Sequence, residues 1–92
     1  MYEKTVVVRN KTGLHARPAS LFVRCAKDFK SNITLQKASG ESDPIEAKSI
    51  LMLLAAAIGQ GEEITIRAEG EDEVAAVDTL IALIESAFGE EE

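Results

Sequence analysis

The chain has 92 residues, a net charge of −6 and a hydrophobic fraction of 46%. This length predicts a single domain over residues 1–92, because a second domain would not bury a core of its own. The acidic balance argues against nucleic acid as a partner, since nucleic-acid binding needs a basic face. A lone cysteine leaves no internal disulfide and no multi-cysteine metal site, and we expect no bound metal.

The apolar segments of the chain are short. Residues 50–58 form the longest apolar run, which is too short to cross a membrane. Residues 1–9 alternate charge and valine, unlike the apolar segment of a signal peptide. We therefore expect a cytoplasmic protein without membrane insertion.

The first predicted elements are a strand at 2–9, a polar loop at 10–13 and a helix at 16–29. The strand follows from its threonine and valine content. The helix follows from apolar residues spaced three and four apart, and Pro18 fits its first turn, where no N–H is needed. The apolar face predicted for this helix comprises Ala16, Ala19, Phe22, Val23, Ala26 and Phe29.

The later elements are a half-buried strand at 32–37, a weaker strand at 41–47, a short apolar helix at 48–58, another half-buried strand at 62–69 and a helix at 72–88. Pro44 confines the weaker strand to an edge or a bulge. Glycines at 59 and 61 end the short helix, and Gly89 stops the last one. The expected core stripe of the last helix is Val74, Val77, Leu80, Ile81, Ile84 and Phe88.

This order, β-α-β-β-α-β-α, leaves three apolar helix stripes to be covered. A four-stranded antiparallel sheet with three helices on one face buries all of them and leaves its other face to solvent. The predicted fold class is therefore α+β, an open-faced β-sandwich. Residues 89–92 are expected to form a frayed acidic tail.

The segment 13–19 reads Gly-Leu-His-Ala-Arg-Pro-Ala and holds the only histidine of the chain. It places His15 at the start of a helix, where backbone N–H groups and the helix dipole favour an anion. Arg17 adds a guanidinium whose fork matches phosphate oxygens. A neutral imidazole is a suitable nucleophile for reversible phosphoryl transfer, so His15 is the candidate carrier, with Ala16 and Arg17 around the phosphate. The alternatives are a helix cap for His15 and a solvated surface cation for Arg17.

A second candidate region is the start of the helix at 48–58. Ser49 is first of all an N-cap, a role for which serine is common. Leu53, Leu54 and Ile58 are expected in the core. Ile50 and Leu51, in the first turn, are candidates for an exposed docking patch.

These features resemble the histidine-containing phosphocarrier family, HPr, of the bacterial sugar phosphotransferase system. The resemblance covers essentially the whole chain. It is most specific at residues 13–19 and is supported at Lys48-Ser49-Ile50, Gly59-Gln60-Gly61 and Ala68-Glu69-Gly70-Glu71-Asp72-Glu73. The family has the open-faced sandwich fold.

The resemblance implies a role for each candidate residue. His15 matches the histidine that accepts a phosphoryl group from enzyme I at ring Nδ1 and passes it to enzyme IIA domains, and Arg17 matches the arginine beside the phosphate. Ser49 matches the serine that an ATP-dependent HPr kinase/phosphorylase modifies to regulate carbon use. Ile50 and Leu51 match the patch that meets partner proteins. A phosphocarrier of this kind is a monomer without a cofactor, and magnesium belongs to its partner enzymes.

The chain departs from the family pattern in two places. The stretch between Gly40 and Ser49 is about two residues longer than in typical members, which changes an edge strand. Met52 stands where a small glycine is frequent, which reshapes the docking surface. Two alternatives stay open: a regulatory HPr-like protein serving nitrogen or carbon control, and a small α+β interaction domain in which His15 is only a cap.

Overall fold

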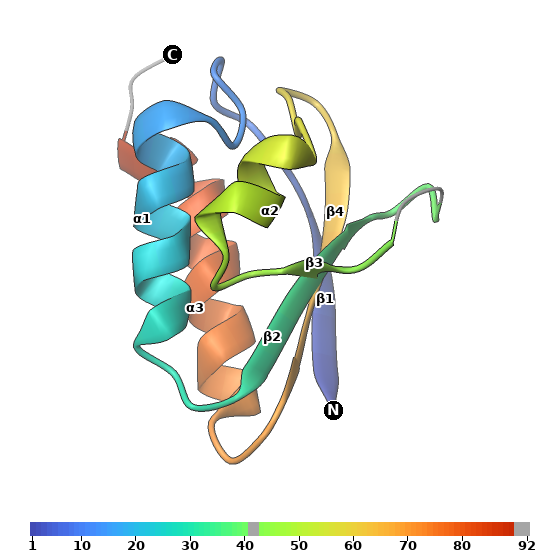
Figure 1. The fold of residues 1–92 in the computed structure, drawn as a ribbon, viewed down its shortest axis with the longest axis vertical. Coiled ribbons are helices and arrows are strands. Elements are labelled where there is room, and N and C mark those ends of the chain that lie inside the picture. Colours follow the sequence, from blue (N-terminus) through green and yellow to red (C-terminus); the bar gives the residue numbers. More distant parts are fainter. Residues whose placement is uncertain (41–42, 90–92) are drawn as a thin grey trace.

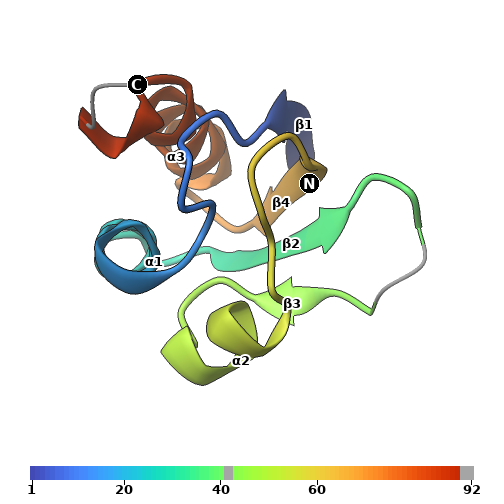
Figure 2. The same cartoon turned by 90° about the horizontal axis from the view of Figure 1, so that it is seen from above.

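The computed structural model describes residues 1–40 and 43–89. One antiparallel sheet contains β1 (Tyr2–Val7), β2 (Asn32–Lys37), β3 (Ile45–Glu46) and β4 (Glu63–Glu69), in the order β1-β4-β2-β3. The helices are α1 (Ala16–Lys27), α2 (Ile50–Ala55) and α3 (Glu73–Glu85), followed by a final 3-10 turn, η1 (Ala87–Gly89). Helices α1 and α3 lie side by side over one face of the sheet, and α2 packs beside α1 near the β3 edge (Figures 1 and 2). The predicted α+β open-faced sandwich is confirmed.

The alternation of the strands decides which face of the sheet is covered. In β4, Ile64, Ile66 and Ala68 are fully buried while the residues between them are exposed or half-buried. Ile66 lies opposite Leu35 of β2, so the apolar rows of neighbouring strands are in register. The core between the sheet and the helices includes Val8, Leu14, Phe22, Ile33, Leu35, Leu53, Ile58, Ile64, Ile66, Val77, Leu80 and Ile84.

One predicted core position of α1 and one of α3 lie outside the core. Ala16 is exposed because it belongs to the junction before the first regular turn of α1. Val74 is 51% exposed. The buried stripe of α3 is centred on Ala76, Val77, Leu80 and Ile84, and successive residues of a helix are about 100° apart, so Val74 falls at its margin.

Several elements are shorter than predicted, and local backbone geometry explains where they end. The edge strand β3 begins only after Pro44, which has no N–H for a ladder; residues 41–42 of the predicted strand lie outside the described residues. Helix α2 ends before Ala57, whose φ is 51°. Helix α3 ends at Glu85, and Ala87 and Phe88 adopt φ values of 55° and 59° before Gly89. Of the predicted tail, residues 90–92 lie outside the described residues.

The turn between α1 and β2 is tied to the start of α3. The carboxylate of Asp72 accepts hydrogen bonds from the Ser31 hydroxyl, from the Lys30 N–H at 2.8 Å and from the Ser31 N–H at 3.0 Å. These bonds, the hydroxyl first, hold the pKa of the Asp72 carboxyl below its ordinary value. Ser31 is buried, and it follows the C-terminal end of α1, whereas His15 caps the N-terminal end.

None of the helices in residues 1–40 and 43–89 has the length and apolar character needed to span a membrane. The same residues bring no three histidine, cysteine, aspartate or glutamate side chains together as a metal-binding group.

Candidate functional site

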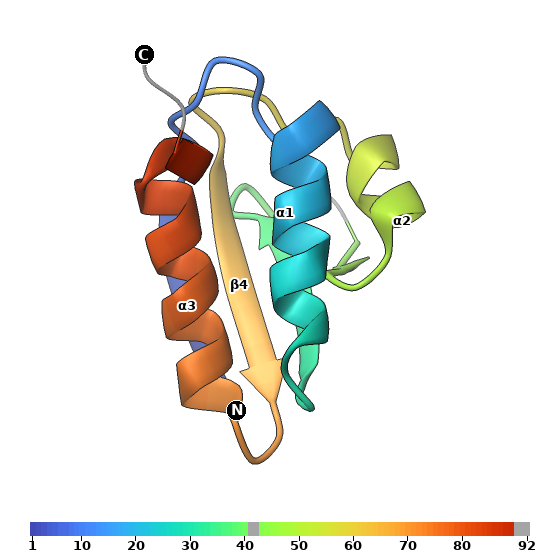
Figure 3. The same cartoon turned by 90° about the vertical axis from the view of Figure 1, so that its left-hand side faces the viewer.

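The loop before α1 is anchored to the loop before β4. The N–H of Leu14 donates to the carbonyl of Ile58 at 2.9 Å, and the N–H of Gly61 donates to the carbonyl of Val8 at 2.8 Å. The side chain of Leu14 is fully buried. Two loops that are far apart in the sequence therefore form one unit, beside the N-terminal end of α1 (Figure 3).

Side chains reinforce this unit. The Gln60 amide donates to the carbonyl of Arg9 at 3.1 Å, and the Glu62 carboxylate accepts from the N–H of Gly59 at 2.7 Å. The bond from Gly59, followed by Lys37 at 3.3 Å, keeps the pKa of the Glu62 carboxyl below its ordinary value. The carboxylate form of Glu62 thus stabilises the loop on which the segment before His15 rests.

Gly13 is required by the close approach of the two loops. Its φ is +65°, in the left-handed region that favours glycine, and a Cβ there would lie 2.4 Å from the carbonyl oxygen of Ile58. The same Cβ would lie 2.7 Å from the Cα of Gly59. Glycine lets the backbone pass here without collision and continue through Leu14 to His15.

His15 occupies the N-cap position of α1, with φ −129° and ψ 164°, and its side chain is half-buried. The imidazole makes no capping hydrogen bond. The alternative in which His15 serves only as a cap therefore lacks the bond that defines a cap. Its ring nitrogens are available for other chemistry.

The first turn of α1 presents backbone donors beside His15. Among the described residues, no backbone carbonyl accepts from the N–H groups of Ala16 and Arg17, and Pro18 has none to offer. Free N–H groups at a helix start, together with the helix dipole, stabilise an anion. The structure thus places free backbone N–H groups next to the candidate nucleophile.

The backbone conformation at Ala16 was not predicted from the sequence. Its φ of 52° lies in the left-handed region, which costs a residue with a Cβ about 1–2 kcal/mol. The conformation persists because the anchored loop holds one side of the junction and the packed helix holds the other. The backbone therefore turns sharply between His15 and the regular part of α1.

Basic side chains follow one exposed stripe of α1. Arg17, Arg24 and Lys27 are exposed, and within the part of the chain that the structure describes their side chains form no hydrogen bond or ion pair. They are spaced three to seven residues apart and so lie on one side of the helix. In a chain of net charge −6, this stripe is a local basic surface that begins at the candidate site.

Ser49 caps the short helix α2. Its Oγ accepts a hydrogen bond from the N–H of Met52 at 3.2 Å, as predicted for an N-cap, and its side chain is half-buried. The following residue, Ile50, lines a pocket of about 300 Å³ with Arg24 and Lys27 of α1. Ser49 therefore stands one residue from a pocket lined by two basic side chains.

The surface of α2 is more apolar than predicted. Ile50 and Leu51 are exposed as expected, Leu51 at 78%. Met52 and Leu54 are exposed too, which corrects the expectation that Leu54 is buried: a helix of six residues covers the core mainly with Leu53. We call Ile50, Leu51, Met52 and Leu54 the α2 patch.

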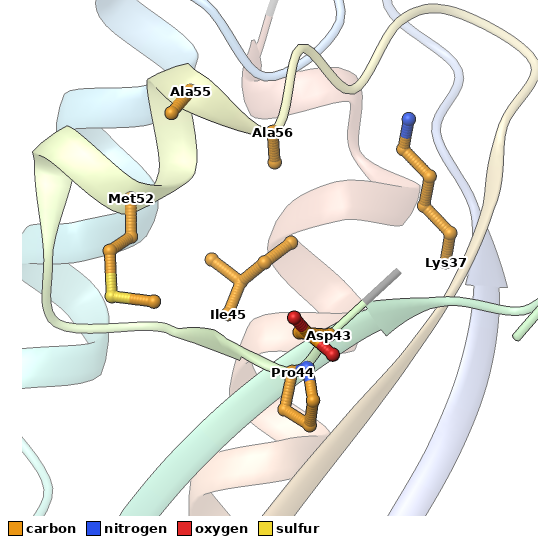
Figure 4. A pocket seen from close by; sticks show the side chains of 7 residues that line it. All are labelled: Lys37, Asp43, Pro44, Ile45, Met52, Ala55 and Ala56. Carbon is orange, nitrogen blue, oxygen red and sulfur yellow. The ribbon is translucent and has the colours of Figure 1, made fainter. Parts of the chain in front are cut away.

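The α2 patch continues toward the sheet edge. Met52 lines a pocket of about 490 Å³ together with Lys37, Asp43, Pro44, Ile45, Ala55 and Ala56 (Figure 4). The exposed apolar surface is therefore not limited to the outer side of α2. It extends over the gap between α2 and the chain that enters β3.

Two contributors to the site carried no clear signal in the sequence. Asn10 is fully buried in the loop before His15, and its amide donates to the carbonyl of Gly13 at 2.7 Å. An asparagine three residues before a glycine is a turn signal, but its burial cannot be read from the pattern. The acceptor role of the Ile58 carbonyl depends on a contact across the fold and has no local signature.

Comparisons with known proteins identify the family of the chain. The family described as the PTS HPr component phosphorylation site matches residues 2–86. The chain is 49% identical over 85 residues to the HPr-like protein Crh of Halalkalibacterium halodurans, covering 92% of this chain and 98% of the relative. It is 48% identical over 84 residues to the phosphocarrier protein HPr of Haemophilus influenzae, covering 91% of this chain and 95% of the relative.

A solved structure shows the same architecture. HPr-C-His from Thermoanaerobacter tengcongensis superposes with a TM-score of 0.94 at 46% identity, and the match covers 100% of both chains. The family match spans nearly the whole chain and includes the loop, helix start and α2 region described above. The chain therefore belongs to the HPr family, whose members are phosphocarrier proteins and not enzymes with turnover of their own.

Proposed function

We propose that His15 accepts a phosphoryl group at Nδ1 from enzyme I and passes it to enzyme IIA domains of the sugar phosphotransferase system. One observation carries this proposal: within residues 1–40 and 43–89, the imidazole makes no hydrogen bond, and it stands at a helix start whose N–H groups at Ala16 and Arg17 have no backbone acceptor. A nucleophile and anion donors are thus brought together on a rigid junction. Catalysis of phosphoryl transfer rests largely on such positioning and charge stabilisation.

In the transfer step, the lone pair of the neutral ring nitrogen forms a bond to phosphorus while the bond between phosphorus and the donor atom breaks. The donor keeps the electron pair of the broken bond, and the other ring nitrogen keeps its hydrogen. The phosphoryl oxygens then lie near the N–H groups of Ala16 and Arg17 and the guanidinium of Arg17. Transfer to enzyme IIA is the same step in reverse with a different acceptor.

The test is incubation of the chain with enzyme I and phosphoenolpyruvate, followed by intact mass and peptide mapping. We expect a mass gain of one phosphoryl group, on the peptide containing His15, in a form labile to acid and stable to base. An unmodified chain under conditions in which a known HPr is fully phosphorylated would contradict the proposal.

Arg17 is proposed to contact the phosphate through its planar fork. Arg17→Lys keeps the charge but loses the bidentate geometry, so we expect transfer from enzyme I to slow about tenfold or more. The melting temperature should not change, because the side chain is exposed and unpaired. Arg24→Lys, on the same helix stripe, is the matched control and should transfer at nearly the parent rate. Equal rates for the two variants would make Arg17 a simple surface cation.

The α2 patch and the basic stripe of α1 are proposed as the docking surface for enzyme I and enzyme IIA domains. The two surfaces meet at Ile50, which lines a pocket with Arg24 and Lys27. Their chemistry suits a partner that presents apolar side chains surrounded by carboxylates. The carboxylates would be steered by the basic stripe, and the apolar side chains would cover α2.

Leu51 is the most exposed member of the α2 patch. Leu51→Asp is expected to weaken binding of enzyme I about tenfold, as loss of an interface anchor does, while the free energy of unfolding changes by less than about 0.5 kcal/mol. Val74→Asp is the control, because Val74 is also exposed but lies at the start of α3. Calorimetric titration with enzyme I checks both variants. Similar affinities for Leu51→Asp and Val74→Asp would place the docking surface elsewhere.

A regulatory role at Ser49 is a second candidate function. HPr-like Crh proteins and phosphocarrier HPr proteins match the chain at 49% and 48% identity, so similarity alone does not separate carbon control from sugar uptake. We propose that an HPr kinase/phosphorylase modifies Ser49. Its hydroxyl is half-buried and engaged with the Met52 N–H, so modification exchanges a neutral cap for an anionic one at the same helix start.

Ser49→Asp tests the effect of that charge. We expect the fold and the reaction of His15 with small phosphoryl donors to be retained, because an anion suits a helix N-terminus. Transfer from enzyme I should slow about tenfold at low salt, because the new charge lies beside the α2 patch and repels an acidic partner. Ser49→Ala, which loses the cap without adding charge, should transfer at the parent rate. A rate for Ser49→Asp that equals that of Ser49→Ala would reduce Ser49 to a cap.

We further infer that residues 1–92 act as one cytoplasmic phosphocarrier domain. A monomer fits a carrier that must expose His15 and the α2 patch to successive partners. Some relatives have been solved as dimers, among them an HPr dimer from Thermoanaerobacter tengcongensis at 46% identity. Analytical ultracentrifugation of the chain decides between the two states.

A further inference from the structure

Asn10 is a buried polar residue in the loop that leads to His15. Its side chain is fully buried. Its Nδ2 donates to the carbonyl of Gly13 at 2.7 Å and to the hydroxyl of Thr12 at 3.0 Å, so both amide hydrogens are used inside the loop. Its Oδ1 is buried without a hydrogen-bond partner among the described residues, so the two bonds from Nδ2 are what offset the cost of burying the amide. The loop is therefore built around this side chain.

The bond to Gly13 fixes one particular peptide unit. The carbonyl of the Gly13–Leu14 peptide accepts from Asn10, and the N–H of the same peptide donates to the carbonyl of Ile58 at 2.9 Å. Rotation of this peptide plane would break both bonds. The next residue in the chain is His15, so the direction in which the backbone reaches His15 depends on this doubly held unit.

We propose that Asn10 is a positioning residue for phosphoryl transfer, which sets the orientation of the Gly13–Leu14 peptide and thereby the placement of the His15 imidazole. The inference rests on the proposed role of His15 as the phosphoryl acceptor. Asn10 does not itself touch the phosphoryl group. It acts through the backbone that connects it to His15.

The function of Asn10 requires a hydrogen-bond donor. An aspartate has the same shape, but its carboxylate only accepts, so the Gly13 carbonyl would lose its partner and face another oxygen. A displacement of the reacting group by about 1 Å can slow a reaction about 100-fold. For Asn10→Asp we therefore expect the maximal rate of transfer from enzyme I to fall about 10- to 100-fold.

The same variant should leave the half-saturating concentration for enzyme I unchanged, because the α2 patch and the basic stripe are untouched. Amide hydrogen exchange gives a second readout. The Leu14 amide should exchange faster in Asn10→Asp than in the parent, while the Ile66 amide in β4 exchanges at the parent rate.

The control for simple destabilisation is Ser31→Ala. Ser31 is also buried and loses its hydrogen bond to Asp72, but it lies at the opposite end of α1. This variant should lower the melting temperature while transfer stays at the parent rate. Where Asn10→Asp melts below the assay temperature, Asn10→Ala is assayed instead, with the same expected loss of maximal rate.

The outcomes separate the two proposals. If the parent chain itself accepts no phosphoryl group at His15, the proposed function is wrong. If the parent accepts it and the maximal rate for the Asn10 variant equals that of the parent, or falls no further than that of Ser31→Ala, the positioning role of Asn10 is overturned. A fall in maximal rate with faster exchange at Leu14 and an unchanged half-saturating concentration supports it.

Discussion

His15→Ala is expected to abolish phosphorylation by enzyme I while leaving the fold intact. His15 is the only histidine of the chain, and no other imidazole can replace it as an acceptor. Its side chain is half-buried and makes no capping hydrogen bond, so its removal leaves no hydrogen-bonding group of the helix start newly unpaired. We expect a change in the free energy of unfolding within about 1 kcal/mol. Intact mass after incubation with enzyme I and phosphoenolpyruvate checks the first point, and thermal unfolding checks the second.

His15→Gln serves as the matched control, because glutamine keeps a polar side chain of similar reach without a nucleophilic ring nitrogen. It should also remain unphosphorylated. Both variants should still compete with the parent chain for enzyme I, since the α2 patch is unaltered. A phosphoryl group on His15→Ala at the parent level would show that another residue carries it and that the proposed site is wrong.

Gly13→Ala is expected to destabilise the chain by about 3 kcal/mol or more. The left-handed φ of +65° alone costs a residue with a Cβ about 1–2 kcal/mol, and the added methyl would lie 2.4 Å from the Ile58 carbonyl oxygen. This oxygen and the Cα of Gly59, which would lie 2.7 Å from the methyl, are backbone atoms. They cannot move aside without breaking the Leu14–Ile58 hydrogen bond. For a domain of this size, the melting temperature should fall by more than about 10 °C.

Gly40→Ala is the control that separates the cost of the left-handed backbone from the cost of the steric clash at Gly13. Gly40 also has a positive φ, +76°, but a Cβ there meets no atom within 4 Å. It should cost only about 1–2 kcal/mol. Gly13→Ala, assayed at a temperature where it is still folded, should also transfer phosphate more slowly than the parent, because His15 follows the displaced loop. Equal melting temperatures for the two alanine variants would show that the loops are not held together as described.

The hydrophobic pattern of the sequence was sufficient to predict the regular elements that bury one face. Alternation at 32–37 and 62–69 predicted β2 and β4 with the correct residues inward, Ile33, Leu35, Ile64, Ile66 and Ala68. Periodicity predicted the buried face of α1, and the unique histidine before a proline in the first turn predicted the helix start that forms the site. Such features are local, because the burial of a residue in a regular element follows from its spacing to neighbours.

The short elements were predicted less well. The sequence favoured a helix over 48–58 and a strand over 41–47, whereas α2 has six residues and β3 two. A helix of that length forms only because it packs against α1 and β3, so its ends depend on neighbours that the local pattern does not contain. The exposure of Leu54 has the same cause, since the short helix can turn only part of its surface to the core.

By itself, the sequence determined the fold class and the identity of the candidate acceptor. Only the tertiary structure decided how His15 is held: the burial of Asn10, the bond from Leu14 to the Ile58 carbonyl and the left-handed backbone at Ala16. The physical reason is that hydrophobic periodicity acts through neighbours along the chain. Backbone hydrogen bonds and torsion angles at a junction are fixed by groups that meet only once the sheet and helices have packed.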